Sequence, residues 1–599
     1  MASLSSTYFT SLRREPSATS AVPALAITVS LTGIVLLALA VHGPLLLMEY
    51  PASSLNANMH MFFAQHYADS WFNPWNEKWF GGFSQTTFPP LAHQWVAIFA
   101  RFMSITLAYM LVQLLAVMLF TVGVFRYSRL WVSDGAARLA AIGSIFLGSL
   151  AMLIYQGGDL PTILATALMI NGVASFYSWV RAGRIMALFT GALLIIAAAS
   201  TEHNSLMFGV PLFAVPCLFL ALTDRESGKQ TSPASFGGVI FRSIVFAILS
   251  GIVIALILMP FYPTLVERVA QLSLDDGSHD NFLFAGTSAV NYWLVPMGGL
   301  LLALPFIFIA GLEKSRLRPL FFAFYLSLLI GLGSTTPVGK LLLGPLYLGV
   351  KIERFTFWST ILALPIIALA AERFIARHPF KAVLSLTTIC VLTLAAPFMW
   401  MLRYPNNPNP LRTDYIVSFL NRDFHNRYRY LTLGFGTNFG EVSRLADAQT
   451  MDGAYTRGRL LPELAPYGSL RLDNAKAYGA PGMEALRAVL KHANQYGLKY
   501  IFVRDRFYEP LIAFAGWRKI ENYENGNVTL WGKEDIPTIQ RTDPPTVLSG
   551  FQRITWGIFP MVSCLLGLGL LFFWHDRKAE ASDPTYEGRQ LREVRNVQA

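Results

Sequence analysis

The chain has 599 residues, of which 54% are hydrophobic and only 14% are charged, and its mean hydropathy is +0.44. This composition excludes an ordinary soluble globular protein, so a bilayer must surround most of the chain. The formal net charge of +11 does not indicate a nucleic-acid partner, because much of the lysine and arginine falls in short loops between apolar runs, where it orients a membrane protein.

Apolar runs of roughly 20 residues, the length needed to cross a bilayer, recur along the sequence. The first follows Arg13 and Arg14 and is too long for a signal-peptide core, so we expect it to remain as a membrane anchor. About twelve spans are predicted, near residues 22–47, 104–125, 137–156, 160–181, 185–200, 204–222, 237–261, 289–312, 318–334, 355–375, 382–402 and 553–574. The expected fold class is a mainly α, polytopic bundle of transmembrane helices.

The long loop 48–103 follows the first span and is rich in aromatic residues. Its part 48–90 contains three tryptophans, Trp71, Trp75 and Trp79. They are typical of an interfacial helix whose aromatic side chains lie at the level of the lipid headgroups. A further helix is expected to start at Pro89-Pro90, either as an amphipathic or re-entrant helix over 89–103 or as an extension of the next span.

Loops rich in lysine and arginine alternate with loops poor in them, which predicts cytoplasmic termini and places the loop 48–103 on the extracytoplasmic side. Region 403–548 falls on the same side, and its short apolar runs between turn residues predict a small α/β domain. We expect a helix near 482–497, a strand at 499–503 and a hairpin around Asn525-Gly526. The predicted organisation is a cytoplasmic segment 1–21, a membrane domain 22–402 with first outer loop 48–103, the α/β domain 403–548, a final span 549–575 and a cytoplasmic disordered tail 576–599.

Polar residues that could carry chemistry fall on the predicted outer side. His60 and Asp69 lie in the first loop, although a lone histidine on an apolar helical face is usually just buried and satisfied. Asp159 starts a span, where a carboxylate also serves as a helix cap. Glu202 stands beside His203 between two spans, where an acid next to a histidine is uncommon.

Arg354 begins an apolar span on the predicted outer side, against the usual distribution of positive charge. Its forked donors match a phosphate, while the alternatives are a snorkelling side chain or an ion pair with Glu353. Lys340 precedes it and could assist in binding an anion.

An acidic cluster in the loop 262–288 offers hard oxygen ligands at close spacing. Its members are Asp275, Asp276 and Asp280. They predict a site for a divalent cation such as Mg²⁺ or Mn²⁺, and a solvated turn explains the cluster equally well.

Several short motifs occur in a characteristic order. They are Asn56-x-x-x-His60, Trp75, Gly81-Gly82, Pro89-Pro90-Leu91, Gly158-Asp159-Leu160-Pro161, Glu202-His203-Asn204, Arg354-Phe355 and the strand sequence beginning at Gly497. Together they resemble the glycosyltransferase C superfamily of membrane proteins, and are most similar to its branch of 6-pyruvoyl-tetrahydropterin-synthase-related membrane proteins, a name that implies no pterin chemistry. The resemblance implies a glycosyltransferase-C-like helix bundle with a C-terminal extracytoplasmic α/β domain, in a bacterial or archaeal cytoplasmic (inner) membrane.

The resemblance also implies an activity in envelope or polysaccharide biosynthesis. A hexosyl or pentosyl unit would pass from a polyprenyl-phosphate donor to an extracytoplasmic lipid, glycan or protein acceptor, with a first-loop carboxylate as base or metal ligand. The expected partners are the lipid-linked sugar, the lipid or glycan acceptor and the membrane, and no protein partner is indicated. The residues expected to bind substrate are Arg354, Lys340, Asn56 and Trp75.

The sequence departs from the superfamily at Asn56, where relatives carry an aspartate, because an amide cannot accept a proton as a base. Either Asp69 or His60 replaces that aspartate, or Asp159 or Glu202 supplies the carboxylate, or the transferase activity has been lost.

Loss of activity would make the chain a catalytically degenerate subunit for envelope or complex assembly. A transporter or flippase is less favoured, because transport predicts charged residues in the middle of spans or broken helices in paired halves, and the sequence shows no such internal repeat.

Overall fold

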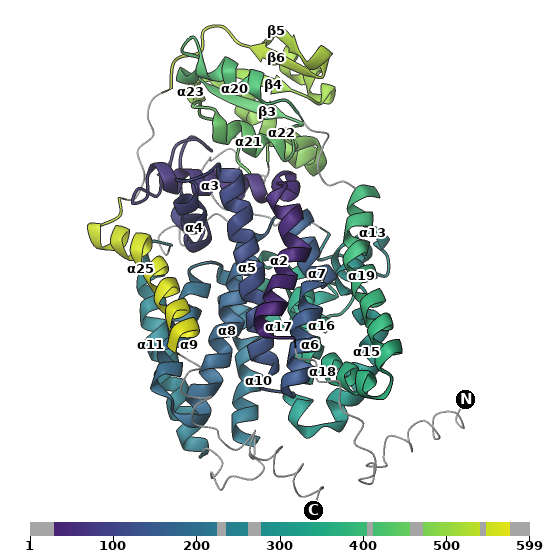
Figure 1. The fold of residues 1–599 in the computed structure, drawn as a ribbon. Coiled ribbons are helices and arrows are strands. Elements are labelled where there is room, and N and C mark those ends of the chain that lie inside the picture. The colour runs from purple at the N-terminus through teal and green to yellow at the C-terminus, as the bar shows by residue number, and fades with distance from the viewer. Residues whose placement is uncertain are drawn as a thin grey trace, which may run out of the picture.

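The structure of the chain is a computed structural model that describes residues 29–223, 235–261, 277–403, 411–455, 471–539 and 547–574. A bundle of long helices carries a small domain with a β-sheet at one end (Figure 1). We call this end of the bundle the domain-bearing face.

The helices of the bundle are apolar over most of their length. They are α2 (Leu31–Leu47), α5 (Ile105–Ser128), α6 (Asp134–Ile145), α7 (Gly148–Ala151), α8 (Leu160–Ala182), α9 (Ile185–Ala199), α10 (Val210–Thr223), α11 (Phe236–Leu258), α13 (Gly286–Ala289), α14 (Val295–Met297), α15 (Leu300–Glu313), α16 (Arg318–Gly331), α17 (Val338–Leu343), α18 (Glu353–Arg377), α19 (Pro379–Arg403) and α25 (Gly550–Gly569).

In the part of the chain that the structure describes, eight helices are long and apolar enough to cross a membrane, and a bent pair of helices forms a ninth candidate. The helices α2 and α9 are apolar but shorter, and α16 has 14 residues. Together these helices account for the predicted apolar segments. The chain is therefore a multi-pass membrane protein of the predicted helical class.

The predicted span 289–312 differs from expectation because it is broken. Its two halves, Gly286–Met297 and Leu300–Glu313, meet at an angle of 63°. At the break, Gly298 has a φ of +48°, which favours glycine, and a Cβ there would lie 2.8 Å from a side-chain carbon of Thr393 on α19. Gly298 and the next residue, Gly299, thus let α19 pass close to the backbone of the broken span.

Helix α8 packs tightly at the centre of the bundle. A Cβ atom on Gly172 would lie 3.2 Å from the carbonyl oxygen of Gly191 on α9, and one on Gly191 would lie 3.1 Å from the carbonyl oxygen of Gly172. On its other side, Arg126 of α5 donates hydrogen bonds to Asn171 and Ser175. Close backbone contact and interhelical hydrogen bonds are what hold helices together in lipid. The start of α8 is therefore rigidly placed.

The first loop folds into helix α3 (Ala57–Asp69), the short strands β1 (Trp75–Asn76) and β2 (Phe83–Ser84), and helix α4 (Leu91–Phe99). Helix α4 starts directly after Pro90, as predicted, and a turn separates it from α5. It is therefore a helix of its own and not an extension of the next span.

The aromatic residues of the first loop do not all lie at the headgroup level. Trp79 is fully buried and stacks on Phe62, with ring centroids 3.8 Å apart. The first-loop side chains that join the hydrophobic core of the α/β domain are Phe62, Phe63, Trp79, Phe80 and Phe83. The interfacial interpretation is wrong for Trp79, because its indole completes the core of the neighbouring domain.

The α/β domain contains a four-stranded sheet in the order β3-β4-β6-β5. Its elements are α20 (Asp414–Asn421), β3 (Arg429–Leu433), α21 (Asn438–Leu445), α22 (Gly479–Lys491), α23 (Ala493–Tyr496), β4 (Leu498–Val503), α24 (Glu509–Phe514), β5 (Arg518–Tyr523) and β6 (Val528–Gly532). Strands β3 and β4 are parallel, and the other neighbours are antiparallel. The predicted helix, the strand after Gly497 and the hairpin around Asn525-Gly526 are all present.

The α/β domain sits directly on the first loop (Figure 1). Asn58 of α3 donates from Nδ2 to the carbonyl oxygen of Thr437 at 3.3 Å, and a Cβ atom on Gly440 of α21 would lie only 2.8 Å from the Cβ of Asn58. Lys78 donates to the carbonyl oxygen of Arg444 at 3.1 Å. The domain and α3 are therefore one packed unit.

Candidate active site at the domain-bearing face

Two segments far apart in the sequence meet where α3 and α8 begin. The backbone N–H groups of Leu55 and Asn56 donate to the carbonyl oxygens of Gln156 and Gly157 at 3.0 and 2.9 Å. Gly158 follows with a φ of +64°, and a Cβ atom there would lie 2.8 Å from the backbone nitrogen of the first residue of α3. This glycine is needed for the close approach, because no side chain fits at that position.

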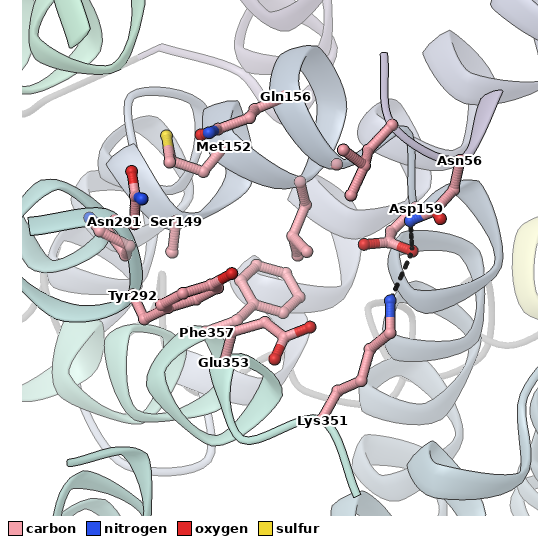
Figure 2. A pocket seen from close by; sticks show the side chains of 14 residues that line it. Asn56, Ser149, Met152, Gln156, Asp159, Asn291, Tyr292, Lys351, Glu353 and Phe357 are labelled. Carbon is pink, nitrogen blue, oxygen red and sulfur yellow. Dashed lines mark hydrogen bonds and ion pairs between the residues drawn. The ribbon is translucent and has the colours of Figure 1, made fainter. Parts of the chain in front are cut away.

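Asp159 lies at the N-cap position of α8, but its side chain makes no capping hydrogen bond. Its Oδ1 instead accepts a hydrogen bond from Asn56 Nδ2 at 3.1 Å and lies 3.9 Å from Lys351 Nζ (Figure 2). Among the described residues, both of these interactions use Oδ1, which leaves Oδ2 for another partner. The capping interpretation therefore does not explain this carboxylate.

Asp159 lines a cavity of about 120 Å³ beneath the domain-bearing face. Asn56, Asp159 and Lys351 lie together at one end of it, and Asn291 and Tyr292 lie across from them (Figure 2). The other lining residues are Leu55, Ser149, Met152, Leu153, Gln156, Gly157, Pro296, Glu353 and Phe357. The cavity thus joins the carboxylates of Asp159 and Glu353 to the ammonium of Lys351 and several hydrogen-bonding groups.

Arg354 and Glu202 form an ion pair beside this cavity, and both side chains are buried. Glu202 also accepts hydrogen bonds from the hydroxyls of Thr162 at 2.9 Å and Ser205 at 2.6 Å. Arg354 is only 7% exposed, so it does not snorkel toward the membrane surface. Its ion-pair partner lies at the end of another span, which fixes the guanidinium in place.

The guanidinium of Arg354 is only partly used by the protein. Its Nη2 atom contacts Glu202 and Thr162, whereas Nε and Nη1 are buried and have no hydrogen-bond partner among the described residues. Buried donors that stay unsatisfied are costly, so they commonly mark the place of a ligand or an ordered water. The free donors of Arg354 therefore suit an anionic group.

His60 pairs with His93, a residue on α4. His60 Nδ1 lies 3.1 Å from His93 Nε2, so one of these two nitrogens donates a hydrogen bond to the other. His60 Nε2 is buried and has no hydrogen-bond partner among the described residues.

Burial, the largest cause, acts together with the positive charges of Lys351 and Arg354 to lower the pKa of His60 to about 3. Burial also holds the pKa of His93 well below its usual value. Both imidazoles are therefore neutral at pH 7. His60 lies one helical turn after Asn56, to whose carbonyl oxygen its backbone N–H donates at 3.0 Å.

The buried histidine pair predicts a loss of stability in acid. Below about pH 6.5 a histidine in the unfolded chain binds a proton, whereas His60 in the folded protein stays unprotonated. The free energy of unfolding at pH 5 should therefore be lower by about 2 kcal/mol for each buried histidine of the pair. Thermal unfolding in lipid nanodiscs at pH 7.5 and pH 5 measures this. The double variant His60→Gln/His93→Gln should lose less stability between these values, and an equal loss would contradict the assignment.

The remaining predicted residues lie elsewhere. Asp69 and Trp75 line a separate cleft at the far end of α3. The ring of His203 packs at a tilt against Phe261, with centroids 4.6 Å apart, although its neighbour Glu202 belongs to the site. Lys340 is exposed, with its ammonium 5.8 Å from the ring centroid of Tyr347. The structure therefore brings together five of the predicted residues, Asn56, His60, Asp159, Glu202 and Arg354. The other four, Asp69, Trp75, His203 and Lys340, lie apart from them.

The predicted metal site can be followed only in part. Asp275 and Asp276 lie outside the described residues, and Asp280 accepts a hydrogen bond from the hydroxyl of Ser288 at 2.6 Å. Within the described ranges, no group of three or more His, Cys, Asp or Glu side chains is arranged to hold a metal ion. A divalent cation stays a prediction.

Several residues of the site had not been assigned from the sequence. Lys351 carries the same signal as Arg354, a positive charge on the side of the membrane where few are expected. His93, Thr162 and Ser205 offered no such signal, because each is an ordinary residue in its own segment and gains its role from a partner on another segment.

No protein-family model matches the sequence, and no curated protein sequence matches it. Solved structures do resemble it. The chain is similar to ArnT from Cupriavidus metallidurans bound to undecaprenyl phosphate, with a TM-score of 0.51 and 10% identity over 85% of this chain and 100% of that one. The apo state of ArnT gives a TM-score of 0.50 and 10% identity over 84% of this chain and 98% of that one.

A mutant form of the arabinofuranosyltransferase AftD from mycobacteria is also similar, with a TM-score of 0.50 and 14% identity. The match covers 84% of this chain but 41% of that one, so the chain spans about two fifths of the length of AftD. At these identities the likeness concerns the fold. Taken with the multi-pass bundle and its small sheet domain, it assigns the chain a glycosyltransferase-C-type fold.

Proposed function

We propose that the protein is a membrane glycosyltransferase that moves a sugar from a polyprenyl-phosphate donor to an acceptor hydroxyl, with the reaction at Asp159. The domain-bearing face would be extracytoplasmic and the termini cytoplasmic, as the loop charges predict. The finer resemblance to 6-pyruvoyl-tetrahydropterin-synthase-related membrane proteins also stays a prediction.

The observation that carries the proposal is the contact between Asn56 and Asp159. Relatives are expected to carry a carboxylate at position 56, and here the amide of Asn56 holds the carboxylate of Asp159 at 3.1 Å. This contact puts a carboxylate from another segment beside position 56, which supports Asp159 as the base. Glu202 is less suited to this role, because Arg354, Thr162 and Ser205 all engage it.

The chemistry then follows from the positions of the charged groups. Oδ2 of Asp159 accepts the proton of the acceptor hydroxyl, and the hydroxyl oxygen forms a bond to the anomeric carbon as the bond from that carbon to the phosphate oxygen breaks. Negative charge grows on the departing lipid phosphate. Lys351, 3.9 Å from Asp159, and the donors of Arg354 that have no partner among the described residues would stabilise it.

An apolar groove offers room for a polyprenyl tail. It has a volume of about 600 Å³, lies between α10 and α16, and is lined by aliphatic and aromatic side chains. One end is at Phe355, the neighbour of Arg354, and the other is near Arg318. A lipid whose phosphate is bound at Arg354 would therefore find an apolar path along the bundle. The structure of ArnT is described as bound to undecaprenyl phosphate, which supports a donor of this kind.

The test is a transfer assay in nanodiscs with undecaprenyl-phosphate-linked sugars and a lipid extract as the source of acceptor. We expect Lys351→Gln to lower kcat/KM on the order of 10²-fold, the usual loss when one preorganised donor to a developing charge is removed. Lys340→Gln is the matched control, because Lys340 is an exposed lysine that lies over Tyr347 and does not line the cavity. It should transfer sugar at the rate of the unchanged protein.

Two results would contradict the proposal. Equal activity in Lys351→Gln and the unchanged protein would remove Lys351 from the site. A complete lack of transfer by the unchanged protein with every donor would favour the catalytically degenerate subunit, which the asparagine at position 56 also suggests.

A further inference from the structure

A second polar cavity lies at the far end of α3, between the first loop and the α/β domain. We call it the polar cleft. Its volume is about 270 Å³, and it is lined by Phe62, Gln65, His66, Asp69, Ser70, Asn73, Trp75, Asn76, Glu77, Lys78 and Arg444. Its wall comes from α3, the segment after it, and α21, so the cleft exists only because the domain is seated on the loop.

Hydrogen bonds hold much of the cleft in place before any ligand arrives. Gln65 Nε2 donates to Asp69 Oδ1 at 3.0 Å, and the two lie one helical turn apart on α3. His66 Nε2 lies 2.7 Å from the carbonyl oxygen of Asn73, which identifies it as the donor. Lys78 Nζ donates to the carbonyl oxygen of Arg444. Ligand sites with a few fixed polar groups of this kind are usually pre-formed.

The charges of the cleft balance. Asp69 and Glu77 are negative, and Lys78 and Arg444 are positive. Burial lowers the pKa of His66, so its imidazole adds no charge at pH 7. A free ion would gain little from such a surface, whereas a neutral ligand with many hydroxyl groups meets both donors and acceptors, because each hydroxyl can donate and accept.

Two further features suit a sugar ring. Arg444 Nε is buried and has no hydrogen-bond partner within the described ranges, so it still needs an acceptor. Phe62 and Trp75 add apolar carbon to the wall, although both rings are almost fully buried, so the polar groups of the cleft supply most of the contacts to a sugar. The mixture of paired charges, amides and aromatic carbon is the chemistry of saccharide recognition.

We propose that the polar cleft binds a saccharide unit of the acceptor, which makes the acceptor an oligosaccharide or a glycan-bearing molecule. This inference rests on the proposed function for the choice of acceptor. Asn56 at the start of α3 belongs to the reaction site and Asp69 at its end belongs to the cleft, and thirteen helical residues span roughly 20 Å. The unit in the cleft would therefore be several sugar units away from the hydroxyl that reacts.

The cleft can be tested by equilibrium binding, which needs no turnover. The full-length protein in nanodiscs is applied to an array of neutral and anionic oligosaccharides, and the dissociation constant of the best neutral ligand is measured. The double variant Gln65→Leu/Asp69→Leu should weaken binding at least about tenfold, the loss expected when a few hydrogen bonds to a sugar are removed. Asp69 is exposed and Gln65 half-buried, so the fold should survive. Glu484→Leu, an exposed acid on α22, is the control.

The transfer assay separates this inference from the proposed function. With the array-selected oligosaccharide as acceptor, the cleft variant should raise KM for the acceptor and leave kcat and the KM for the donor unchanged. The inference is overturned if the unchanged protein binds no neutral oligosaccharide, if it binds only anionic ones, or if the cleft variant binds as tightly as Glu484→Leu. If binding depends on the cleft but Asp159→Asn transfers sugar normally, the cleft stands and the assigned reaction site fails.

Discussion

Replacing Asp159 by asparagine is expected to reduce sugar transfer by about 10²- to 10⁴-fold, the contribution of a positioned general base. Asn56 would still find an acceptor in the new amide oxygen, and the carboxylate makes no helix cap that could be lost. The variant should therefore fold and bind the donor lipid as before. The measurements are kcat in nanodiscs and the binding of undecaprenyl phosphate.

A swap of the two residues gives the sharper test. In Asn56→Asp/Asp159→Asn the carboxylate moves to the side of the pair where relatives are expected to carry it, while the amide and carboxylate can still hydrogen-bond. This double variant should recover part of the activity that Asp159→Asn loses. If Asp159→Asn alone transfers sugar at the normal rate, Asp159 is not the base.

Replacing Arg354 by methionine should cost both stability and donor binding. The change leaves the buried carboxylate of Glu202 without its cation, and breaking a buried ion pair in this way usually costs about 3–5 kcal/mol. It also removes the donors placed for the lipid phosphate. The expected results are a lower midpoint of thermal unfolding and a weaker affinity for undecaprenyl phosphate.

A second substitution separates the two effects. In Arg354→Met/Glu202→Gln no charge is left unpaired, so much of the lost stability should return, because a neutral pair of similar volume often replaces a buried ion pair at little cost. Donor binding should not return, since the guanidinium is still absent. A double variant that binds and transfers as well as the unchanged protein would show that Arg354 has only a structural role.

The spans, the strand at 499–503 and the hairpin at Asn525-Gly526 could be predicted because each follows from a short stretch of sequence. The break at Gly298-Gly299 could not be read in the same way, because the hydropathy of the segment is continuous across it. Its reason is the close passage of α19, which is a tertiary contact.

Part of the candidate site could likewise be predicted from the sequence, and part could not. That polar residues gather on one side of the bundle could be predicted, since loop charges give every loop a side. Which residues of the site contact one another could not be predicted. Asn56 and Asp159 are 103 residues apart, and His60 and His93 are 33 residues apart. Trp79 is one of the tryptophans that were expected at the lipid headgroups, and it lies in the core of the α/β domain.

The sequence by itself determined that this protein is a multi-pass helical membrane protein with one small sheet domain. Within lipid, every backbone polar group must be satisfied inside its own segment, so each span is a local property of an apolar run. Only the tertiary structure decided which carboxylate stands beside Asn56, that Arg354 keeps free donors, and that a polar cleft forms against the seated domain. These features depend on how helices pack, and packing depends on side chains from distant segments that no local pattern records.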